Sequence, residues 1–246
     1  MLKTARIWLN HFEYHAEHPR SIREDLSNVL TGAERRAISR SIATFQLGEQ
    51  SEGRTLLALS RRYAARLDCA PLARITELLI HEEARHAELL GAFMDSQAIP
   101  RKRRAATDLM FRVLRRLAGF EHALCVLIAA ELIGNVYYRA LEAATRCERL
   151  RMLCRTLVAD ELAHIGFESE LLFAMRERRA PFALAIQRRA HLAFFVAAAF
   201  VVWHTHRAVL RRAGYGLRSF LGACRSQYAF YLEPPRTAPE LGTLRP

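Results

Sequence analysis

Two Glu-x-x-His motifs are the residues of this sequence best placed to do chemistry together: Glu83 with His86, and Glu161 with His164. On an α-helix, side chains three residues apart leave the same face one turn apart, so both members of such a pair can reach one metal ion. The glutamate and histidine content of the chain predicts about one such pair by chance. The motifs therefore gain their meaning from the elements that must position them.

Each motif lies on the inward stripe of a predicted helix and is matched by a lone glutamate on an earlier helix. Apolar residues spaced three and four apart predict one amphipathic helix over residues 38–63, with Glu49 in the middle of its apolar stripe. Glu131 occupies the same place in a later stripe. Glu83 follows Glu49 by 34 residues, and Glu161 follows Glu131 by 30. Two helical hairpins would therefore bring each lone glutamate level with its motif.

Four carboxylates at the centre of a bundle repel one another, and burying them ionised and unpaired costs several kcal/mol each. Two divalent cations would supply the neutralising charge. Six ligands of mixed oxygen and nitrogen type, with open coordination positions, suit Fe(II) or Mn(II) better than Zn(II), which favours closed sets of four. The alternative is a metal-free core neutralised by arginines or buried water. The agreement of six residues in register favours the metal.

This pattern resembles the ferritin-like di-iron carboxylate proteins over about residues 38–176. The matching pieces are residues 45–50 (FQLGEQ), 82–86 (EEARH), 129–131 (AAE) and 160–164 (DELAH). Within that superfamily, Gly-Glu-Gln followed by Glu-x-Arg-His is similar to the aldehyde-deformylating oxygenases, which cleave fatty aldehydes to hydrocarbons. The CxxC iron site of rubrerythrin-type peroxidases is absent from the sequence.

The resemblance implies a role for each residue of the set. One iron ion would be held by Glu49, Glu83 and His86, and the other by Glu131, Glu161 and His164. Glu83 and Glu161 would bridge the two ions. Asp160 would accept a hydrogen bond from the far N–H of His86, and Glu82 would do the same for His164.

Four further residues on these stripes are open to more than one interpretation. Glu52 and Glu168 could be additional ligands or proton carriers, and a salt bridge in the bundle core is the favoured interpretation for both. Tyr138, like Tyr63, could be a redox-active tyrosine, and ordinary core packing is the favoured interpretation.

The chain is predicted to be all-α, because 11 Gly and 8 Pro are too few for the turns of a β-sandwich or barrel. We expect a ferritin-like four-helix bundle, made of two helical hairpins joined by a crossover, with additional C-terminal helices. The predicted organisation is an N-terminal arm (1–33), the bundle (34–180), extra helices packing on the bundle (181–232) and a Pro-rich tail (233–246).

The charge balance of +12, with a pI near 10.2, attracts polyanions such as an acidic partner protein or an anionic membrane surface. No nucleic-acid-binding motif is present, so no specific nucleic acid is expected. Five cysteines without a CxxC indicate buried thiols in a reducing compartment. The N-terminus lacks the apolar run of a signal peptide, and the uncharged stretch 191–206 is shorter than the ~20 residues that span a membrane. We expect a cytoplasmic protein whose apolar helix is a candidate for peripheral membrane contact.

The leading hypothesis is a non-haem di-iron oxidase or oxygenase that activates O2 at a carboxylate-bridged pair of Fe ions, or of Mn and Fe. It would use an external electron donor and oxidise a small, apolar organic or acyl substrate. The side chains expected around the site are Leu56, Leu90, Leu127, Tyr138 and Leu171. Two alternatives stay open: a ferroxidase that feeds an iron-storing cage, and a non-catalytic helical module that binds partners through its basic faces. The complete set of six ligands speaks against the module, and a homodimer is compatible with the sequence.

Overall fold

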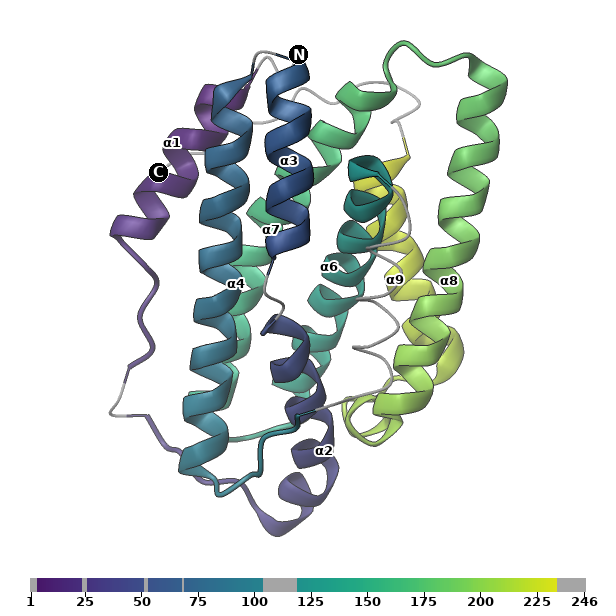
Figure 1. Ribbon diagram of the computed structural model, residues 1–246. Helices are drawn as coiled ribbons and strands as arrows, with labels where there is room; N and C mark the ends of the chain where they lie inside the picture. Colours follow the sequence, from purple (N-terminus) through teal and green to yellow (C-terminus); the bar gives the residue numbers. More distant parts are fainter. Residues whose placement is uncertain (1–3, 24–25, 51–52, 68, 104–118, 234–246) are drawn as a thin grey trace.

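The computed structural model describes residues 4–23, 26–50, 53–67, 69–103 and 119–233 (Figure 1). Every regular element within these ranges is a helix. In chain order the helices are α1 (Ala5–Glu17), α2 (Gly32–Glu49), α3 (Arg54–Leu67), α4 (Ala70–Ser96), α6 (Phe120–Ala143), α7 (Glu148–Arg176), α8 (Pro181–Arg212) and α9 (Leu217–Leu232).

The centre of the molecule is a bundle of α4, α6, α7 and a rod in which α3 continues the line of α2 (Figure 1). The α2–α3 rod runs antiparallel to α4, and α6 runs antiparallel to α7. Helix α4 ends and helix α6 begins at opposite ends of the bundle, so the two hairpins are joined by a crossover. The prediction of an all-α bundle built from two hairpins is confirmed.

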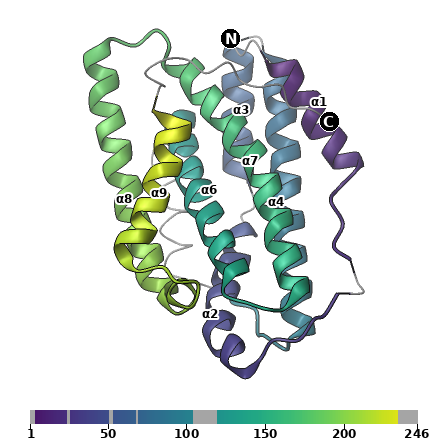
Figure 2. The same ribbon diagram turned by 180° about the vertical axis from the view of Figure 1, so that it is seen from behind.

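Three helices lie outside this bundle. Helix α1 packs along α4, and seen from behind it flanks the bundle on the side opposite α8 and α9 (Figure 2). Helices α8 and α9 pack on α6, and α8 also contacts α2. The additional helices expected within residues 181–232 are therefore present as α8 and α9.

The start of α2 is tied to the turn between α6 and α7 through the buried side chain of Glu34. Thr31 caps α2, and its backbone N–H donates to Glu34 Oε2 at 2.8 Å. The other oxygen, Oε1, accepts from the backbone N–H of Arg146 at 2.6 Å and from the Thr145 hydroxyl at 3.2 Å. One carboxylate thus satisfies donors from two elements that are far apart in the sequence, and it fixes the first hairpin against the second.

The prediction of one continuous helix over residues 38–63 is wrong, because α2 ends at Glu49 and α3 begins at Arg54. Gly53 precedes α3 with a φ of +58°, a backbone conformation that side chains with a Cβ rarely adopt. A Cβ at this position would lie 2.6 Å from the Ile80 side chain. The apolar spacing runs on across the break because α2 and α3 lie nearly in line, so the periodicity does not reveal it.

Two helices, α6 and α8, are long and apolar enough to cross a membrane by length and composition alone. The apolar window of α6 is 83% buried as the central helix of the bundle, whereas that of α8 is only 33% buried. All five cysteines are free and four are fully buried, as expected for thiols that pack in a core.

Replacing Gly53 by Ala is expected to destabilise the protein by more than ~1 kcal/mol, because the new Cβ meets Ile80 and the left-handed backbone is strained. The matched control is Gly222→Ala in the exposed face of α9, where a Cβ meets nothing within 4 Å. This control should be neutral or stabilise by up to ~1 kcal/mol. Urea denaturation followed by circular dichroism measures both changes, and equal stability of the two variants would contradict the strain assigned to Gly53.

Candidate metal centre

The bundle brings all six predicted ligands together in two overlapping clusters. Glu49, Glu83, His86 and Glu161 offer one ligand atom each, and these atoms lie within 4.8 Å of one another. A second cluster, under the same limit, consists of Glu83, Glu131, Glu161 and His164. Glu83 and Glu161 belong to both clusters, which is the arrangement that two ions bridged by two carboxylates require.

The Nδ1 atoms of the two histidines face the shared carboxylates. His164 Nδ1 lies 3.0 Å from Glu83 Oε1 and 3.1 Å from Glu161 Oε2. His86 Nδ1 lies 3.2 Å from Glu161 Oε1 and 3.8 Å from Glu83 Oε1. The rings are stacked with centroids 5.9 Å apart, and both histidines present their Nδ1 edge to the centre of the site.

The outer nitrogen of each histidine is bonded to the acid that precedes the opposite motif. His86 Nε2 lies 3.1 Å from Asp160 Oδ2, and His164 Nε2 lies 3.0 Å from Glu82 Oε2. A carboxylate in this place accepts the Nε2 proton, so the lone pair of the neutral ring is left on Nδ1, toward the centre. Each hairpin therefore orients the histidine of the other.

Arginine side chains hold these outer carboxylates in place. Arg85 Nη2 donates to Asp160 Oδ2 at 2.6 Å and to Glu82 Oε1 at 3.1 Å, and Arg20 Nε donates to Asp160 Oδ1 at 2.8 Å. Burial raises the pKa of Asp160, but the hydrogen bond from His86 and the charge of Arg85 outweigh it and lower the pKa below its usual range. Asp160 is thus kept ionised and able to accept from His86.

The inner groups have the opposite electrostatic problem. Burial and then repulsion by the neighbouring carboxylates hold the pKa of Glu49 and of Glu131 well above the usual range. Burial opposes a charge on His86, but the hydrogen bond to Asp160 and the nearby negative charge of Glu161 raise its pKa to about 10. Burial likewise opposes a charge on His164, and the charge of Glu161 raises its pKa above the usual range. The protein groups by themselves demand positive charge at this point, in the form of protons or of metal ions.

The donor atoms of the site fit two divalent cations. Glu83 Oε1 and His86 Nδ1 are buried and have no hydrogen-bond partner among the described residues, although both face the cluster. A buried polar atom without a partner costs about 1–3 kcal/mol, and coordination to an ion removes that cost. Four carboxylates and two imidazoles are the donors that Fe(II) and Mn(II) accept.

Tyr138, Glu168 and Glu52 were open to more than one interpretation from the sequence. The Tyr138 hydroxyl donates a hydrogen bond to Glu49 Oε1, so this phenol touches a candidate ligand in addition to packing in the core. The salt bridge expected for Glu168 is absent, because both of its buried oxygens lack a partner among the described residues. Burial raises the pKa of Glu168 well above its usual range, which keeps it neutral near His164. Glu52 lies outside the described residues.

A cavity of about 150 Å³ opens beside the cluster. Four of the candidate ligands line it, together with apolar side chains from α3, α4, α6 and α8. Of the side chains expected around the site, Leu56, Leu127 and Tyr138 line this cavity, whereas Leu90 and Leu171 are packed in the core. A cavity of this size holds roughly a benzene-sized molecule.

Several residues of the site were not predicted. Phe12 of α1 stacks on His164, with ring centroids 5.8 Å apart, and closes that side of the centre. Arg20 reaches Asp160 from the segment after α1, and the sequence around it carries no signal of that contact. His206 lines the cavity from α8, where it interrupts the helical backbone with φ −110°. Arg85 lies inside a Glu-x-x-His motif, so its spacing three residues after Glu82 was the available signal.

Comparison with solved structures supports the fold. Two variants of an R2-like ligand-binding oxidase, one with an aerobically and one with an anaerobically reconstituted Mn/Fe cofactor, superpose with TM-scores of 0.61 and 0.63. Each is 15% identical in sequence, and each alignment covers 94% of both chains. No protein-family profile and no curated protein sequence matches the chain. The predicted ferritin-like fold is confirmed.

We expect the affinity of the site for Mn(II) to rise steeply between about pH 6 and pH 8. Glu49, Glu131, His86 and His164 have raised pKa values and must each lose a proton before they bind a metal, so protons compete at lower pH. Each displaced proton contributes up to about tenfold per pH unit. Calorimetric titration in buffers of different ionisation enthalpy counts the protons released.

The matched control for this titration is His204→Ala, which removes an exposed histidine of α8 and should leave the slope unchanged. An affinity that is independent of pH, with no proton released, would show that these groups do not coordinate the ion.

Proposed function

We propose that this protein is an O2-dependent oxidoreductase with a carboxylate-bridged pair of metal ions, Fe/Fe or Mn/Fe, that oxidises a small apolar organic substrate. The observation that carries the proposal is the pair of donor clusters that share Glu83 and Glu161. The fold likeness to oxidases with a Mn/Fe cofactor supports the choice of metals. When bound, the ions supply the redox chemistry with O2, and electrons would come from an external donor.

The chain contributes orientation to this chemistry. Asp160 and Glu82 hold the Nε2 protons of His86 and His164, so that both Nδ1 lone pairs point inward without a search among rotamers. Arg20 and Arg85 restrain Asp160 in turn. A site whose ligands are held in this way binds its ions with little further loss of side-chain conformational entropy.

Other residues exclude water and hold protons. Phe12 covers His164 on one side, and the apolar lining of the cavity replaces water beside the four glutamates. Tyr138 holds its hydroxyl proton against Glu49, and Glu168 holds a proton on a carboxyl that has no other partner among the described residues. Both groups are placed to give a proton to the site without admitting bulk solvent.

The cavity favours an organic substrate over ferrous iron as the molecule that is oxidised. Its wall beyond the glutamates consists mostly of carbon, including Leu56, Leu127 and Val126. A hydrated cation would gain little from such a surface, whereas an apolar molecule gains about 25 cal/mol for each Å² of its surface that is removed from water. The ferroxidase alternative requires assembly into a large shell, and the interaction module requires no metal at all.

The test is metal content combined with O2 consumption. We expect about two Fe or Mn ions per chain and O2 uptake when Fe(II) is added, whereas Glu161→Ala should lose both ions because it removes a residue shared by the clusters. His204→Ala, which lies outside the clusters, should behave as the wild type. Metal content of the wild type as low as that of Glu161→Ala would refute the metal centre, and a large shell in light scattering would favour the ferroxidase.

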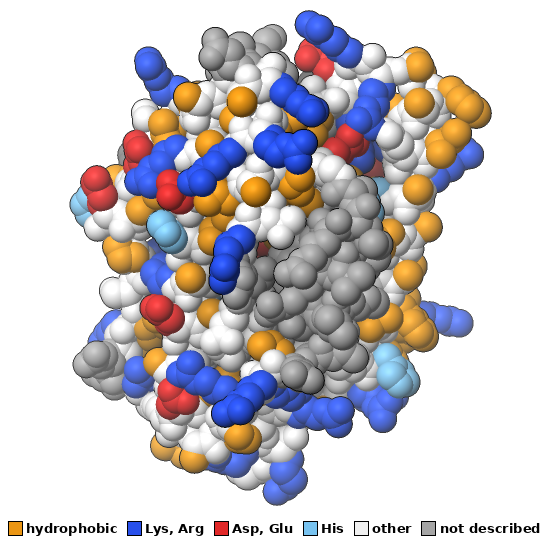
Figure 3. Space-filling model, viewed as in Figure 1, with side chains coloured by type: hydrophobic (Ala, Val, Ile, Leu, Met, Phe, Trp, Pro, Cys, Tyr) orange, Lys and Arg blue, Asp and Glu red, His pale blue; other side chains and the backbone are white. Residues whose placement is uncertain are grey.

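We further propose that the exposed face of α8 lies on an anionic membrane surface. Phe182, Ile186, Val196 and Phe200 are 78%, 51%, 40% and 49% exposed, and Figure 3 shows apolar side chains along the edge that α8 forms. Residues 181–232 contain seven arginines and no acidic residue. Pairing of this face with a second copy would bring arginines together with no carboxylate to compensate them, whereas anionic lipid supplies the opposite charge.

Sedimentation with vesicles that contain phosphatidylglycerol tests this surface. We expect the wild type to sediment with the vesicles, and the double variant Phe182→Ser, Phe200→Ser to remain in the supernatant because it loses the apolar anchor. Phe173→Ser is the matched control, since it removes an exposed phenylalanine from α7 instead. Wild type that stays in the supernatant would refute the membrane contact and leave the metal centre unaffected.

A further inference from the structure

A second cavity, of about 770 Å³, is lined by residues from the second half of α3 and the start of α6. These two helix ends lie toward the same end of the bundle (Figure 1). Its wall is formed by α3, the first turns of α6, the end of α7 and the first half of α8. None of the six candidate metal ligands lines it. It shares the wall residue Val126 with the smaller cavity beside the metal centre, so the two spaces are neighbours with different linings.

The polar part of this lining is strongly basic. Four arginines (Arg62, Arg66, Arg176 and Arg179) face a single carboxylate, that of Glu121. Glu121 accepts from Arg176 Nε at 2.8 Å and from Arg179 Nη1 at 2.9 Å, so its charge is already shared by two guanidinium groups. Arg62 and Arg66 form no hydrogen bond or ion pair with a described residue. Two arginines therefore present uncompensated charge at the rim.

The first turn of α6 adds to this positive potential. The helix begins at Phe120, and its N-cap, Gly119, has no side chain with which to cap the first N–H groups. Both residues line the cavity. The N-terminus of a 24-residue helix carries a partial positive charge that favours anions.

An independent observation comes from His191, which lines the cavity from α8 and is only 6% exposed. Its Nε2 donates to the backbone carbonyl of Cys125 at 2.9 Å, because a carbonyl can only accept. Burial lowers the pKa of His191 to about 4, so the ring is neutral and Nδ1 carries a lone pair. That Nδ1 is buried and has no partner among the described residues. The atom is an acceptor that lacks an O–H or N–H donor.

We propose that this second cavity binds a small organic anion that also carries a hydrogen-bond donor. The phosphate or carboxylate group lies between Arg62 and Arg66, which recognise planar and tetrahedral oxyanions through paired N–H groups. A hydroxyl or amine of the same molecule donates to Nδ1 of His191. Phe120, Met175 and Phe194 cover its carbon skeleton. The site is independent of the metal centre, so it can be tested on metal-free protein.

Calorimetric titration of the metal-free, full-length protein with three probes tests the anionic group and the hydrogen-bond donor of the ligand separately. Glycerol phosphate has an anion and hydroxyl donors, methyl phosphate has the anion without those hydroxyls, and glycerol has the hydroxyls without the anion. We expect saturable binding of glycerol phosphate, weaker binding of methyl phosphate and no binding of glycerol. The absence of saturable glycerol phosphate binding up to about 10 mM would overturn the proposal.

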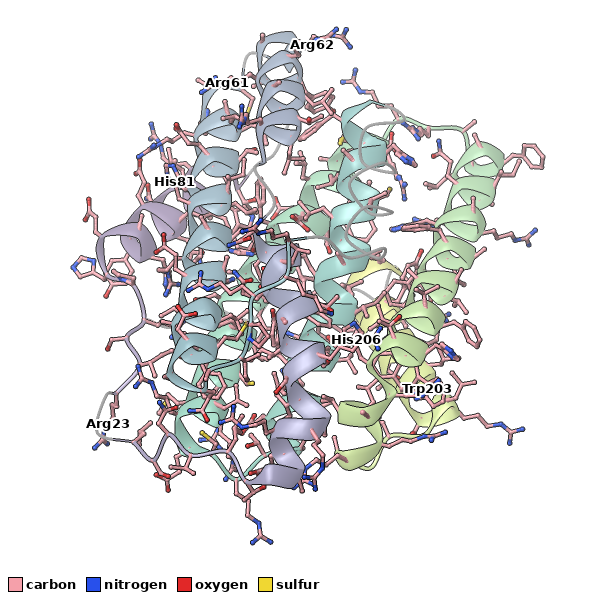
Figure 4. The ribbon with its side chains drawn as sticks, turned by 60° about the horizontal axis from the view of Figure 1, so that its bottom comes forward. Arg23, Arg61, Arg62, His81, Trp203 and His206 are labelled. Atoms are coloured by element: carbon pink, nitrogen blue, oxygen red, sulfur yellow. The ribbon has the colours of Figure 1, made fainter. Side chains whose placement is uncertain are left out.

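Variants locate the binding within the cavity. Arg62→Gln combined with Arg66→Gln should weaken glycerol phosphate at least about tenfold, because each charged hydrogen bond that is lost costs roughly that factor or more. Both side chains are exposed, so the core is not disturbed. Arg61→Gln is the matched control: Arg61 and Arg62 are neighbours near the end of α3 (Figure 4), but Arg61 does not line the cavity. An equal loss in Arg61→Gln would mean that only the general basic charge attracts the anion, and it would overturn the site.

His191→Phe should abolish the preference for glycerol phosphate over methyl phosphate while the affinity for methyl phosphate is kept. The phenyl ring retains the packing of the imidazole against Tyr228, whose ring centroid lies 5.4 Å away. Equal affinities of the wild type for the two phosphates would overturn the role of Nδ1.

Discussion

The structure depends on one electrostatic constraint: four carboxylates and two imidazoles are placed at the centre of an apolar bundle, where the charges of the glutamates cannot be left to solvent. The hairpins, the crossover and the lateral helices bring these six groups together from four directions and keep water away. A bundle designed only for stability would place leucine at these positions, since burial of an aliphatic side chain is favourable and carries no desolvation penalty. Carboxylates and imidazoles at these positions destabilise the bundle, and their presence is therefore best explained by the ions that they can hold.

The acids of the site fall into two sets with opposite electrostatics. Glu49 and Glu131 face the centre, where burial and repulsion by neighbouring carboxylates raise their pKa. Asp160 and Glu82 lie farther out, where histidine partners, and for Asp160 also Arg85, lower the pKa. This difference in pKa between the inner and outer acids matches their different roles in the site. The outer acids stay ionised and can hold the Nε2 protons of the histidines, while the inner acids give up protons only to a cation that replaces them. Because each outer acid precedes the motif of the other hairpin, neither hairpin forms a finished site alone.

The sequence was sufficient for the bundle and for the convergence of the six groups, because Glu-x-x-His spacing and apolar periodicity are local properties that a helix converts directly into faces. The sequence was insufficient to predict contacts between side chains of distant segments. The contact of Arg20 with Asp160 spans 140 positions, and neither residue carries a local signature of the other. The lack of a partner for Glu168 among the described residues could not be predicted either, since a glutamate on an inward stripe looks the same in the sequence with or without a nearby cation. The helix break after Glu49 was not predicted, because the apolar stripe of α2 continues in phase into α3.

The break between α2 and α3 and the cavity beside the metal centre are one structural feature. Glu49 and Gly53 flank the break, and both line the cavity together with Gly48 on the same segment. Across from them, Gly134 of α6 also lines it, and a Cβ on Gly48 or on Gly134 would meet nothing within 4 Å. An uninterrupted helix with ordinary side chains at these positions would fill the space at native packing density. The bundle therefore obtains this cavity by omitting side chains and interrupting one helix next to a candidate ligand, while the three unbroken helices keep the other candidate ligands in register.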